Sequence, residues 1–403
     1  MPHVRTSPLA PCPTSRREFL AFSSGAVIAG GTLPAAGRAG ADHEIRIGLI
    51  GCGGRGTGAA VQAAAADPGV RIVSLGDMFA DQLASAAHVL ARDAARQFGC
   101  PAKDRFCGVD AYRRVLDTGI DAVLIAAPPH LRPLHVEAAV AAGVHIFCET
   151  PAAIDLPGAI RVARAFARAR AAGRTIGSGL HSRRDVGLAA VIDEIRTGVI
   201  GRAWRVNVHA TPGQPWRLPI QAGWSAAEAR LRNWVSHESF SGGHFVERHV
   251  HAIDRGLWVL GDRRPDLAEP LPIRSGAGVA VRFRFADGAE IRAKCLLGAK
   301  ATWPAREVVD ASRGMRDLSL AADGRRFQAT MDAFLRSIRS GSALSGVPGM
   351  DDSDILIRGS LVAIMGRLSA SSNRPVNWEE MLAAGSLAFP VHQTDGGVNL
   401  AGV

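Results

Sequence analysis

The stretch EIRIGLIGCGGRGTGAAVQAAAA, Glu44–Ala66, decides the fold. Its apolar start predicts a buried strand over Ile45–Ile50, the glycines predict a tight turn, and the alanine-rich end predicts a helix. Glycines in such a turn let the backbone approach a pyrophosphate, whose charge the N–H groups at the helix N-terminus can bind. The expected dinucleotide-binding residues here are Gly51, Gly53, Gly54, Arg55 and Gly56.

A second apolar run, VRIVSLGD, ends at Asp77, 21 residues beyond Gly56. A carboxylate at this place can accept hydrogen bonds from a ribose hydroxyl and repels a 2′-phosphate. The spacing therefore favours NAD over NADP, although the cation Arg55 works against that preference. The alternative is a glycine turn that binds no ligand.

Strands and helices continue to alternate after Asp77. The periodicity predicts helices over residues 80–98, 111–118 and 131–143, and strands over 121–129 and 144–149. This alternation indicates a doubly wound parallel sheet of the Rossmann type, whose ligands lie outside the carboxyl ends of the strands. Pro128 and Glu149 fall at such ends, and we expect both beside the cofactor.

The later sequence indicates a different sheet. Residues 204–210, 278–288 and 290–298 alternate apolar and polar side chains, and Ala286-Asp287-Gly288 is typical of a hairpin turn. We therefore expect these residues to form strands of a second sheet. One face of such a sheet needs covering by substrate or by another subunit, so a homo-oligomer is expected.

The net charge of +10 at first suggests nucleic acid. Lysine, however, occurs only at Lys103, Lys294 and Lys300, and the arginines are scattered through helical patterns such as RVARAFARARAAGR. A nucleic-acid footprint should be clustered, so no nucleic-acid partner is expected.

The N-terminus has the layout of a twin-arginine export signal. Arg16-Arg17 precede a weakly apolar stretch and the small residues Ala39-Gly40-Ala41. The stretch is too short and polar for a convincing membrane anchor. We expect residues 1–41 to be this signal, 42–176 the Rossmann domain and 177–403 the second domain, in a periplasmic or secreted protein. The alternative for residues 1–41 is a disordered basic tail.

The six cysteines show no Cys-x-x-Cys pair, so neither a zinc site nor a cysteine framework is expected. A Cys100–Cys107 disulfide is open in an oxidising compartment. Burial as small hydrophobic residues is the simpler interpretation of Cys52 and Cys148.

Three stretches together resemble the Gfo/Idh/MocA oxidoreductases, the family of glucose–fructose oxidoreductase and inositol dehydrogenase. They are GLIGCGGRG (48–56), APPHLRPLHVEAAVAAGVHIFCETPAA (127–153) and SGGHFVERHVHAIDRGLWVLG (241–261). The likeness extends to SIRSGSA and AIMGRLSASSNRPVNWEEM near the C-terminus. It implies an N-terminal Rossmann domain followed by an α/β domain with a large, mostly antiparallel sheet. It also implies an NAD-dependent oxidation of a sugar or cyclic polyol, in which a lysine, an aspartate and a histidine act on the hydroxyl.

This chain departs from the family pattern at the lysine, where Thr150 stands. The aspartate position is Glu247 and the histidine position is His251, which an i, i+4 spacing puts on one helical face, where they can share a proton. A neutral hydroxyl cannot act as a base near pH 7, so acid–base work is expected to shift to Glu247 and His251. Asp254, one turn on, is expected to orient His251.

Four further side chains are expected to contact substrate: Arg183, Trp234, His244 and Asp254. Trp234 can stack on a sugar face, or else lie in the core or a subunit interface. The density of His and Glu around His244, Glu247 and His251 also allows a metal, but the spacing is not His-Glu-x-x-His, and no metal is expected. Lys294 is an alternative replacement for the lost lysine.

Two other functions stay open. CETPAA (148–153) is similar to the segment of a redox-neutral, NAD-dependent glycoside-cleaving branch that also lacks the lysine. The second alternative is a catalytically weak protein that still binds NAD and sugar. An exported enzyme has no free nicotinamide pool to draw on, so a tightly bound cofactor is expected with either enzyme.

Overall fold

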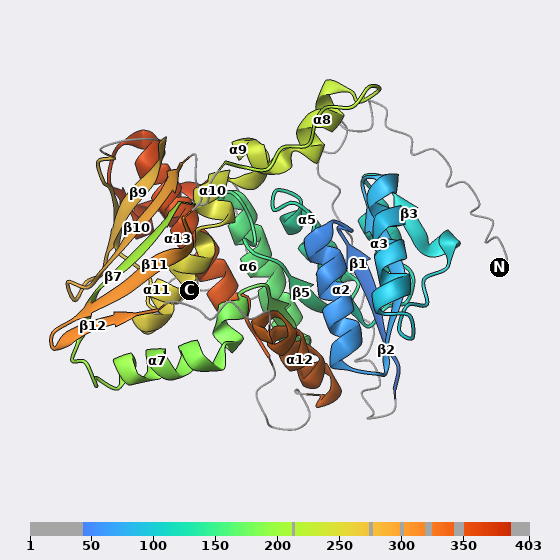
Figure 1. The fold of residues 1–403 in the computed structure, drawn as a ribbon, viewed down its shortest axis with the longest axis horizontal. Coiled ribbons are helices and arrows are strands. Elements are labelled where there is room, and N and C mark those ends of the chain that lie inside the picture. The colour runs from blue at the N-terminus through green and yellow to red at the C-terminus, as the bar shows by residue number, and fades with distance from the viewer. Residues whose placement is uncertain are drawn as a thin grey trace.

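The computed structural model describes residues 43–211, 214–273, 277–298, 302–318, 325–341 and 350–387. The predicted export signal lies outside these residues. Two sheets with their helices make up the described chain (Figure 1).

The first sheet is six-stranded and parallel throughout, as predicted. Its strands are β1 (Ile45–Ile50), β2 (Val70–Asp77), β3 (Arg105–Cys107), β4 (Ala122–Ile125), β5 (His145–Cys148) and β6 (Ile176–Ser178). They lie in the order β3-β2-β1-β4-β5-β6. The order reverses beside β1, so the carboxyl ends of β1 and its neighbours form the crevice where such sheets bind ligands.

Helices cover this sheet on both faces. They are α2 (Gly54–Ala66), α3 (Ala80–Asp93), α4 (Ala111–Leu116), α5 (Arg132–Ala141) and α6 (Leu156–Ala171), with a short 3₁₀ turn η2 (Ala102–Asp104) before β3. The helix predicted over 80–98 ends at Asp93. Residues 97–99 bond to the sheet instead: Ile72 donates to the carbonyl of Gln97, and Gly99 donates to that of Ile72. Pairing with a strand therefore overrode the local helical pattern.

The second sheet is mixed and mostly antiparallel, again as predicted. Its strands are β7 (Ala203–Thr211), β8 (Leu267–Pro270), β9 (Ala277–Arg284), β10 (Glu290–Leu297), β11 (Thr302–Ala311), β12 (Gly314–Asp317) and β13 (Val376–Asn377). The order is β12-β11-β7-β10-β9-β8-β13, and only β7 and β10 run parallel. The hairpin expected between β9 and β10 is present, with Gly288 at φ +80°.

The remaining helical elements follow β6 in the chain. They are η3 (His181–Arg184), α7 (Val186–Arg196), α8 (Ala226–Arg232), η4 (Trp234–Ser236), α9 (Glu238–Ser241), α10 (Gly243–Glu247), α11 (Val250–Val259), α12 (Arg325–Arg339), α13 (Ser353–Ser372) and α14 (Trp378–Leu387).

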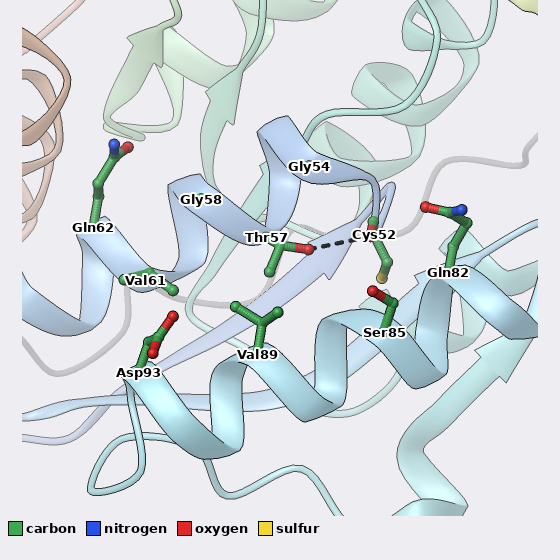
Figure 2. A pocket seen from close by; sticks show the side chains of 10 residues that line it. All are labelled: Cys52, Gly54, Thr57, Gly58, Val61, Gln62, Gln82, Ser85, Val89 and Asp93. Atoms are coloured by element: carbon green, nitrogen blue, oxygen red, sulfur yellow. Dashed lines mark hydrogen bonds between the residues drawn. The ribbon is translucent and has the colours of Figure 1, made fainter. Parts of the chain in front are cut away.

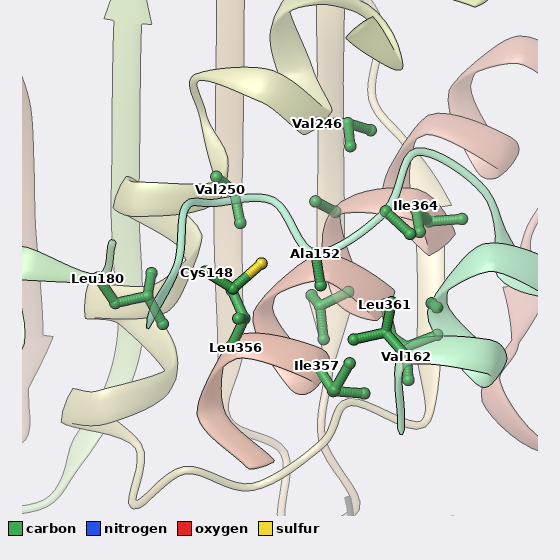
Figure 3. Packing of buried hydrophobic residues seen from close by; sticks show 14 of the residues in the cluster. Cys148, Ala152, Val162, Leu180, Val246, Val250, Leu356, Ile357, Leu361 and Ile364 are labelled. Carbon is green, nitrogen blue, oxygen red and sulfur yellow. The ribbon is translucent and has the colours of Figure 1, made fainter. Parts of the chain in front are cut away.

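Helix α13 joins the two halves. Its Leu356, Leu361 and Ile364 are almost completely buried, and they pack in one cluster with Cys148 of β5 and Val250 of α11 (Figure 3). Helix α13 is long and apolar enough to cross a membrane, but 67% of its 18-residue apolar stretch is buried inside the protein. It serves here as a core helix that fixes the end of β5 against α11.

Helix α12 lies within the predicted second domain but packs on the first. Its Met331, Phe334, Leu335 and Ile338 are buried in the cluster of β1, β2 and α2, so this late segment packs on the Rossmann half. The division at residue 176 follows the order of the chain, whereas the packing returns residues 325–339 to the first domain.

Candidate active site

The glycine turn after β1 has the geometry of a dinucleotide cradle. Gly51 lies at φ +93°, and a Cβ there would come within 2.5 Å of the backbone nitrogen of Ala127. A Cβ on Gly56 would lie 1.9 Å from the carbonyl oxygen of Gly51, so only glycine lets α2 approach β1 this closely. At Gly54 a Cβ would meet nothing within 4 Å. The start of α2 is thus open, and its first N–H groups are available to an anion.

Asp77 braces this cradle from the end of β2. One carboxylate oxygen accepts from the N–H of Cys52 at 2.7 Å, and the other from the N–H of Phe79 at 2.9 Å. Burial raises the pKa of Asp77, and the two backbone donors oppose that rise. Each oxygen keeps lone-pair capacity for a ribose hydroxyl. Asp77 therefore lies where the sequence predicted, with a bracing role that sequence analysis missed.

A cavity of about 390 Å³ adjoins the cradle. It lies between α2 and α3, from Cys52 and Gly54 at the turn to Asp93 at the far end of α3 (Figure 2). Thr57 lines the cavity near the turn, and its hydroxyl donates to the carbonyl of Cys52 at 3.1 Å.

Arg55 and Glu149 meet across the crevice. The Nε of Arg55, on α2, donates to the carboxylate of Glu149 at 2.7 Å, and its guanidinium lies 5.0 Å from the ring centroid of Phe327 on α12. Glu149 follows β5, and a Cβ on Gly179 would come within 2.1 Å of its carboxylate. Pro128 follows β4 at the same edge of the sheet. The predicted cofactor residues thus gather at the carboxyl ends of β1, β2, β4 and β5.

Thr150 is in direct contact with His251. Their Oγ1 and Nε2 atoms are 3.2 Å apart, and the Nδ1 of His251 is buried without a hydrogen-bond partner in the described part of the protein. Burial lowers the pKa of His251 well below its usual range, and the nearby cations Arg255 and Arg132 add to the shift. The imidazole is therefore neutral near pH 7 and keeps a lone pair with which to accept a proton.

The expected Glu247–His251 pair is not formed. Helix α10 ends at Glu247 and α11 begins at Val250, so the two residues lie on different helices and not on one face. The break occurs where His249 turns to the sheet and bonds the carbonyl of Val208 at 3.0 Å. The carboxylate of Glu247 lies 3.3 Å from the Nε of Arg248, and burial raises its pKa.

Asp254 does not orient His251 but holds Arg183. The Nη2 of Arg183 donates to Asp254 at 2.7 Å and to Asp262 at 2.6 Å, and the side chains of Arg183 and Asp254 are 7% and 1% exposed. Both predicted substrate contacts are thus used within the protein, because a buried carboxylate needs a charged partner. The pair fastens η3 to α11.

His181 is a site residue that sequence analysis missed. It follows β6, its ring centroid lies 5.0 Å from that of His251 and 4.0 Å from that of Phe327, and its Nδ1 bonds the carbonyl of Gly179. Burial lowers the pKa of His181 to about 3. Its position after a parallel strand was a usable signal. Phe327 gave none, because its place depends on α12 packing back on the first domain.

The other expected substrate residues lie apart from this contact. Trp234 packs edge-on against Trp216, with ring centroids 6.5 Å apart. His244, on α10, has both ring nitrogens buried without a hydrogen-bond partner among the described residues. Lys294 on β10 alternates with the buried Ala293 and Cys295, so it lies on the opposite face of the sheet and does not replace the lysine.

Metal and disulfide chemistry find no support at these residues. In the described ranges, no group of three or more His, Cys, Asp or Glu side chains could hold a metal ion. None of the five cysteines there, Cys100 and Cys107 included, forms a disulfide.

Comparison with known proteins agrees with this geometry. A family described as an oxidoreductase family with an NAD-binding Rossmann fold matches residues 45–177. The chain is 31% identical over 163 residues to a 1,5-anhydro-D-fructose reductase of Ensifer adhaerens, covering 40% of this chain and 44% of that one. It is 28% identical over 179 residues to an inositol 2-dehydrogenase of Acidothermus cellulolyticus, covering 44% and 48%. It thus matches about half the length of these relatives.

The fold is shared with solved structures over most of the chain. A myo-inositol 2-dehydrogenase from Lactobacillus plantarum superposes with a TM-score of 0.64 at 20% identity, covering 83% of this chain and 99% of that one. A scyllo-inositol dehydrogenase from Lactobacillus casei with bound NAD(H) and scyllo-inositol gives 0.63 at 17% identity, covering 83% and 98%. At such identities the likeness concerns the fold alone.

Proposed function

We propose that the chain is a Gfo/Idh/MocA oxidoreductase, as the match of residues 45–177 supports, and that it is an NAD-dependent enzyme acting on a small carbohydrate or cyclic polyol. The observation that carries the proposal is the contact between Thr150 and His251 at the carboxyl edge of the Rossmann sheet. The printed activities of the relatives, on anhydrofructose and inositol, support this substrate class.

The residues present fit a dinucleotide. The cradle of Gly51, Gly54 and Gly56 admits a pyrophosphate, and Arg55 adds positive charge beside it. The carboxylate of Asp77 lies at the end of β2, which supports NAD over NADP. A nicotinamide held there would supply hydride transfer to or from a carbon of the substrate.

His251 is the proton acceptor in this proposal. We place the proton-accepting lone pair on Nε2, which faces the Oγ1 of Thr150, because Nδ1 is buried. Thr150 then orients the base without itself carrying a charge. Glu247 and His244 on α10, which have buried polar atoms without a hydrogen-bond partner among the described residues, are the further candidates for contact with the substrate.

Export and retention of the cofactor belong to the same proposal. The twin-arginine pattern at Arg16-Arg17 supports a periplasmic enzyme that carries tightly bound NAD, since that compartment has no free nicotinamide pool. We also propose a homo-oligomer, in which a neighbouring subunit covers the outer face of the second sheet.

One experiment tests the core of this proposal. Nucleotide released from the purified full-length protein is identified by mass and absorbance, and inositol isomers, anhydro sugars and aldoses are then screened for a change in its redox state. We expect NAD or NADH, and net reduction by at least one polyol or sugar. No nicotinamide binding at all would refute the proposal, and release of an aglycone without net NADH would favour glycoside cleavage.

A further inference from the structure

One segment of the second domain reaches over the Rossmann domain. Residues 214–241, which we call the strap, connect β7 to α10 and contain α8, η4 and α9. Figure 1 shows α8 and α9 extending from the second sheet to a position above α5. The strap is held together internally by Asn233, whose side chain bonds the backbone N–H of Leu218 at 2.6 Å and the carbonyl of Ala229 at 3.0 Å.

The first anchor of the strap is Arg232 on α8. Its two terminal nitrogens each donate to one oxygen of Asp81 at 2.9 Å, and its Nε donates to Glu228 at 2.9 Å. The guanidinium lies 3.9 Å from the ring centroid of Phe79 and 4.6 Å from that of Trp224. The side chain of Arg232 is only 10% exposed, so the arginine is enclosed between strap and domain.

The second anchor joins Phe240 and His130. The Nδ1 of His130 bonds the backbone carbonyl of Phe240 at 3.1 Å, and the two rings stack with centroids 4.7 Å apart. Burial lowers the pKa of His130 to about 4, so this ring is neutral near pH 7 and can donate from Nδ1. The contact is therefore independent of the ion pair at Arg232.

The two anchors stand on either side of the glycine turn. Phe79 and Asp81 follow β2, whereas His130 follows β4, and β1 lies between these strands in the sheet. The strap therefore bridges the two strand ends that flank β1, where the cradle of Gly51–Gly56 opens. The Arg232–Asp81 contact thus lies beside the opening of the cradle.

We propose that the strap retains the adenosine and pyrophosphate half of the cofactor, with the Arg232–Asp81 pair as its latch. This inference rests on the proposed function and adds a group of cofactor-retaining residues outside the Rossmann domain. Opening the latch breaks a bidentate ion pair and removes the guanidinium from between two aromatic rings, so it should be slow relative to an unstrapped site. Such retention suits an enzyme that must keep one cofactor through many turnovers.

The test measures how fast NADH leaves the full-length protein. Protein loaded with NADH is mixed with excess ADP-ribose, and the loss of bound-nucleotide fluorescence is followed for wild type, Arg232→Met, Asp81→Asn and the double variant. We expect each single variant to raise the dissociation rate about tenfold, since changes in affinity appear mainly in dissociation. The double variant should exceed neither single variant by more than about twofold, because the two residues form one contact.

Arg161→Met is the matched control. Arg161 makes a comparable two-nitrogen pair with Glu137 between α6 and α5, away from the strap, and its loss should leave the rate unchanged. Calorimetry with ADP-ribose gives a second readout, in which the dissociation constant should rise by the same factor as the NADH rate. Thermal unfolding of each variant confirms that it is folded.

The outcomes separate the two proposals. The strap proposal would be overturned if both single variants released NADH at rates within twofold of wild type. It would also be overturned if they changed the NADH dissociation rate but not the dissociation constant of ADP-ribose. Either result would leave the proposed function intact. A wild-type protein that binds neither NADH nor ADP-ribose would overturn both.

Discussion

The glycine turn of Gly51–Gly56 and the helical segment Gly242–Asp254 differ in how far the sequence predicted their contacts. In the first, the expected groups are found where the sequence placed them. In the second, the same residues are present but their partners differ: His251 bonds Thr150, and Asp254 bonds Arg183.

The difference arises because the first region depends on backbone conformation and the second on contacts between side chains. The turn relies on backbone atoms and on the absence of side chains, which a run of glycines specifies locally. The helical segment relies on side chains whose partners come from β5, β6 and η3, far away in the sequence. A local pattern can name such residues, but it cannot assign their contacts.

The largest expected effect tests the role of His251. His251→Ala should lower kcat about 10²–10⁴-fold, the usual contribution of a general base, or about 3–5 kcal/mol in the activation barrier. Steady-state assays of oxidation would show this, with NADH binding unchanged as the control. A variant as active as wild type would remove the contrast between the regions, since the cradle alone would then account for activity.

The second-largest effect is expected from breaking the buried ion pair of Arg183 and Asp254. Asp254→Asn keeps the shape of the side chain but leaves Arg183 with one carboxylate, and we expect a loss of about 3 kcal/mol in unfolding free energy. Asp262→Asn is the matched change on the same guanidinium; its carboxylate is 27% exposed, so its loss should cost less. Denaturant unfolding measures both, and equal losses would contradict a special role for the buried carboxylate.

The buried histidines should make the free energy of unfolding decrease as the pH falls. Burial lowers the pKa of His145 to about 4, and its Nδ1 accepts from the N–H of Thr175 at 2.9 Å. The unfolded chain takes up this proton near pH 6.5 and the folded chain does not, so stability is lost as pH falls from about 6.5 toward 4. At pH 5 this one group lowers the free energy of unfolding by about 2 kcal/mol relative to pH 7.5.

His145→Gln removes that titration, so its stability should fall less than that of the wild type between the same two pH values. Denaturant unfolding at both values measures the difference. Parallel pH profiles for the two proteins would show that the pKa of His145 is the same in the folded and unfolded chains.

The smallest effect concerns Thr150. Thr150→Val keeps the shape but loses the hydroxyl that orients His251, and we expect a fall in kcat of tenfold or less, about 1.4 kcal/mol. Thr150→Ser keeps the hydroxyl and should stay near wild type. If Thr150→Val were inactive while His251→Ala remained active, the base would have to be sought elsewhere.

Local sequence patterns were sufficient for the Rossmann half. The strands Ile45–Ile50 and Val70–Asp77 have the predicted bounds, because both are short, apolar and followed by turn signals. The alternation of strands and helices predicted the parallel sheet, and the residues Ala286-Asp287-Gly288 predicted the hairpin. The mostly antiparallel second sheet was predicted from the family resemblance, with which the alternation of apolar and polar residues agreed. The end of α3 was wrong, because pairing of residues 97–99 with β2 is a tertiary effect.

The sequence by itself thus determined the cradle and the identity of the candidate acid–base residues. Only the tertiary structure decided that Thr150 contacts His251, that Arg183 takes Asp254, and that α12 brings Phe327 to Arg55. The physical reason is that a glycine turn is specified by the conformations its own residues allow, whereas a buried charge or imidazole takes whichever partner the packing of distant segments brings within hydrogen-bond distance.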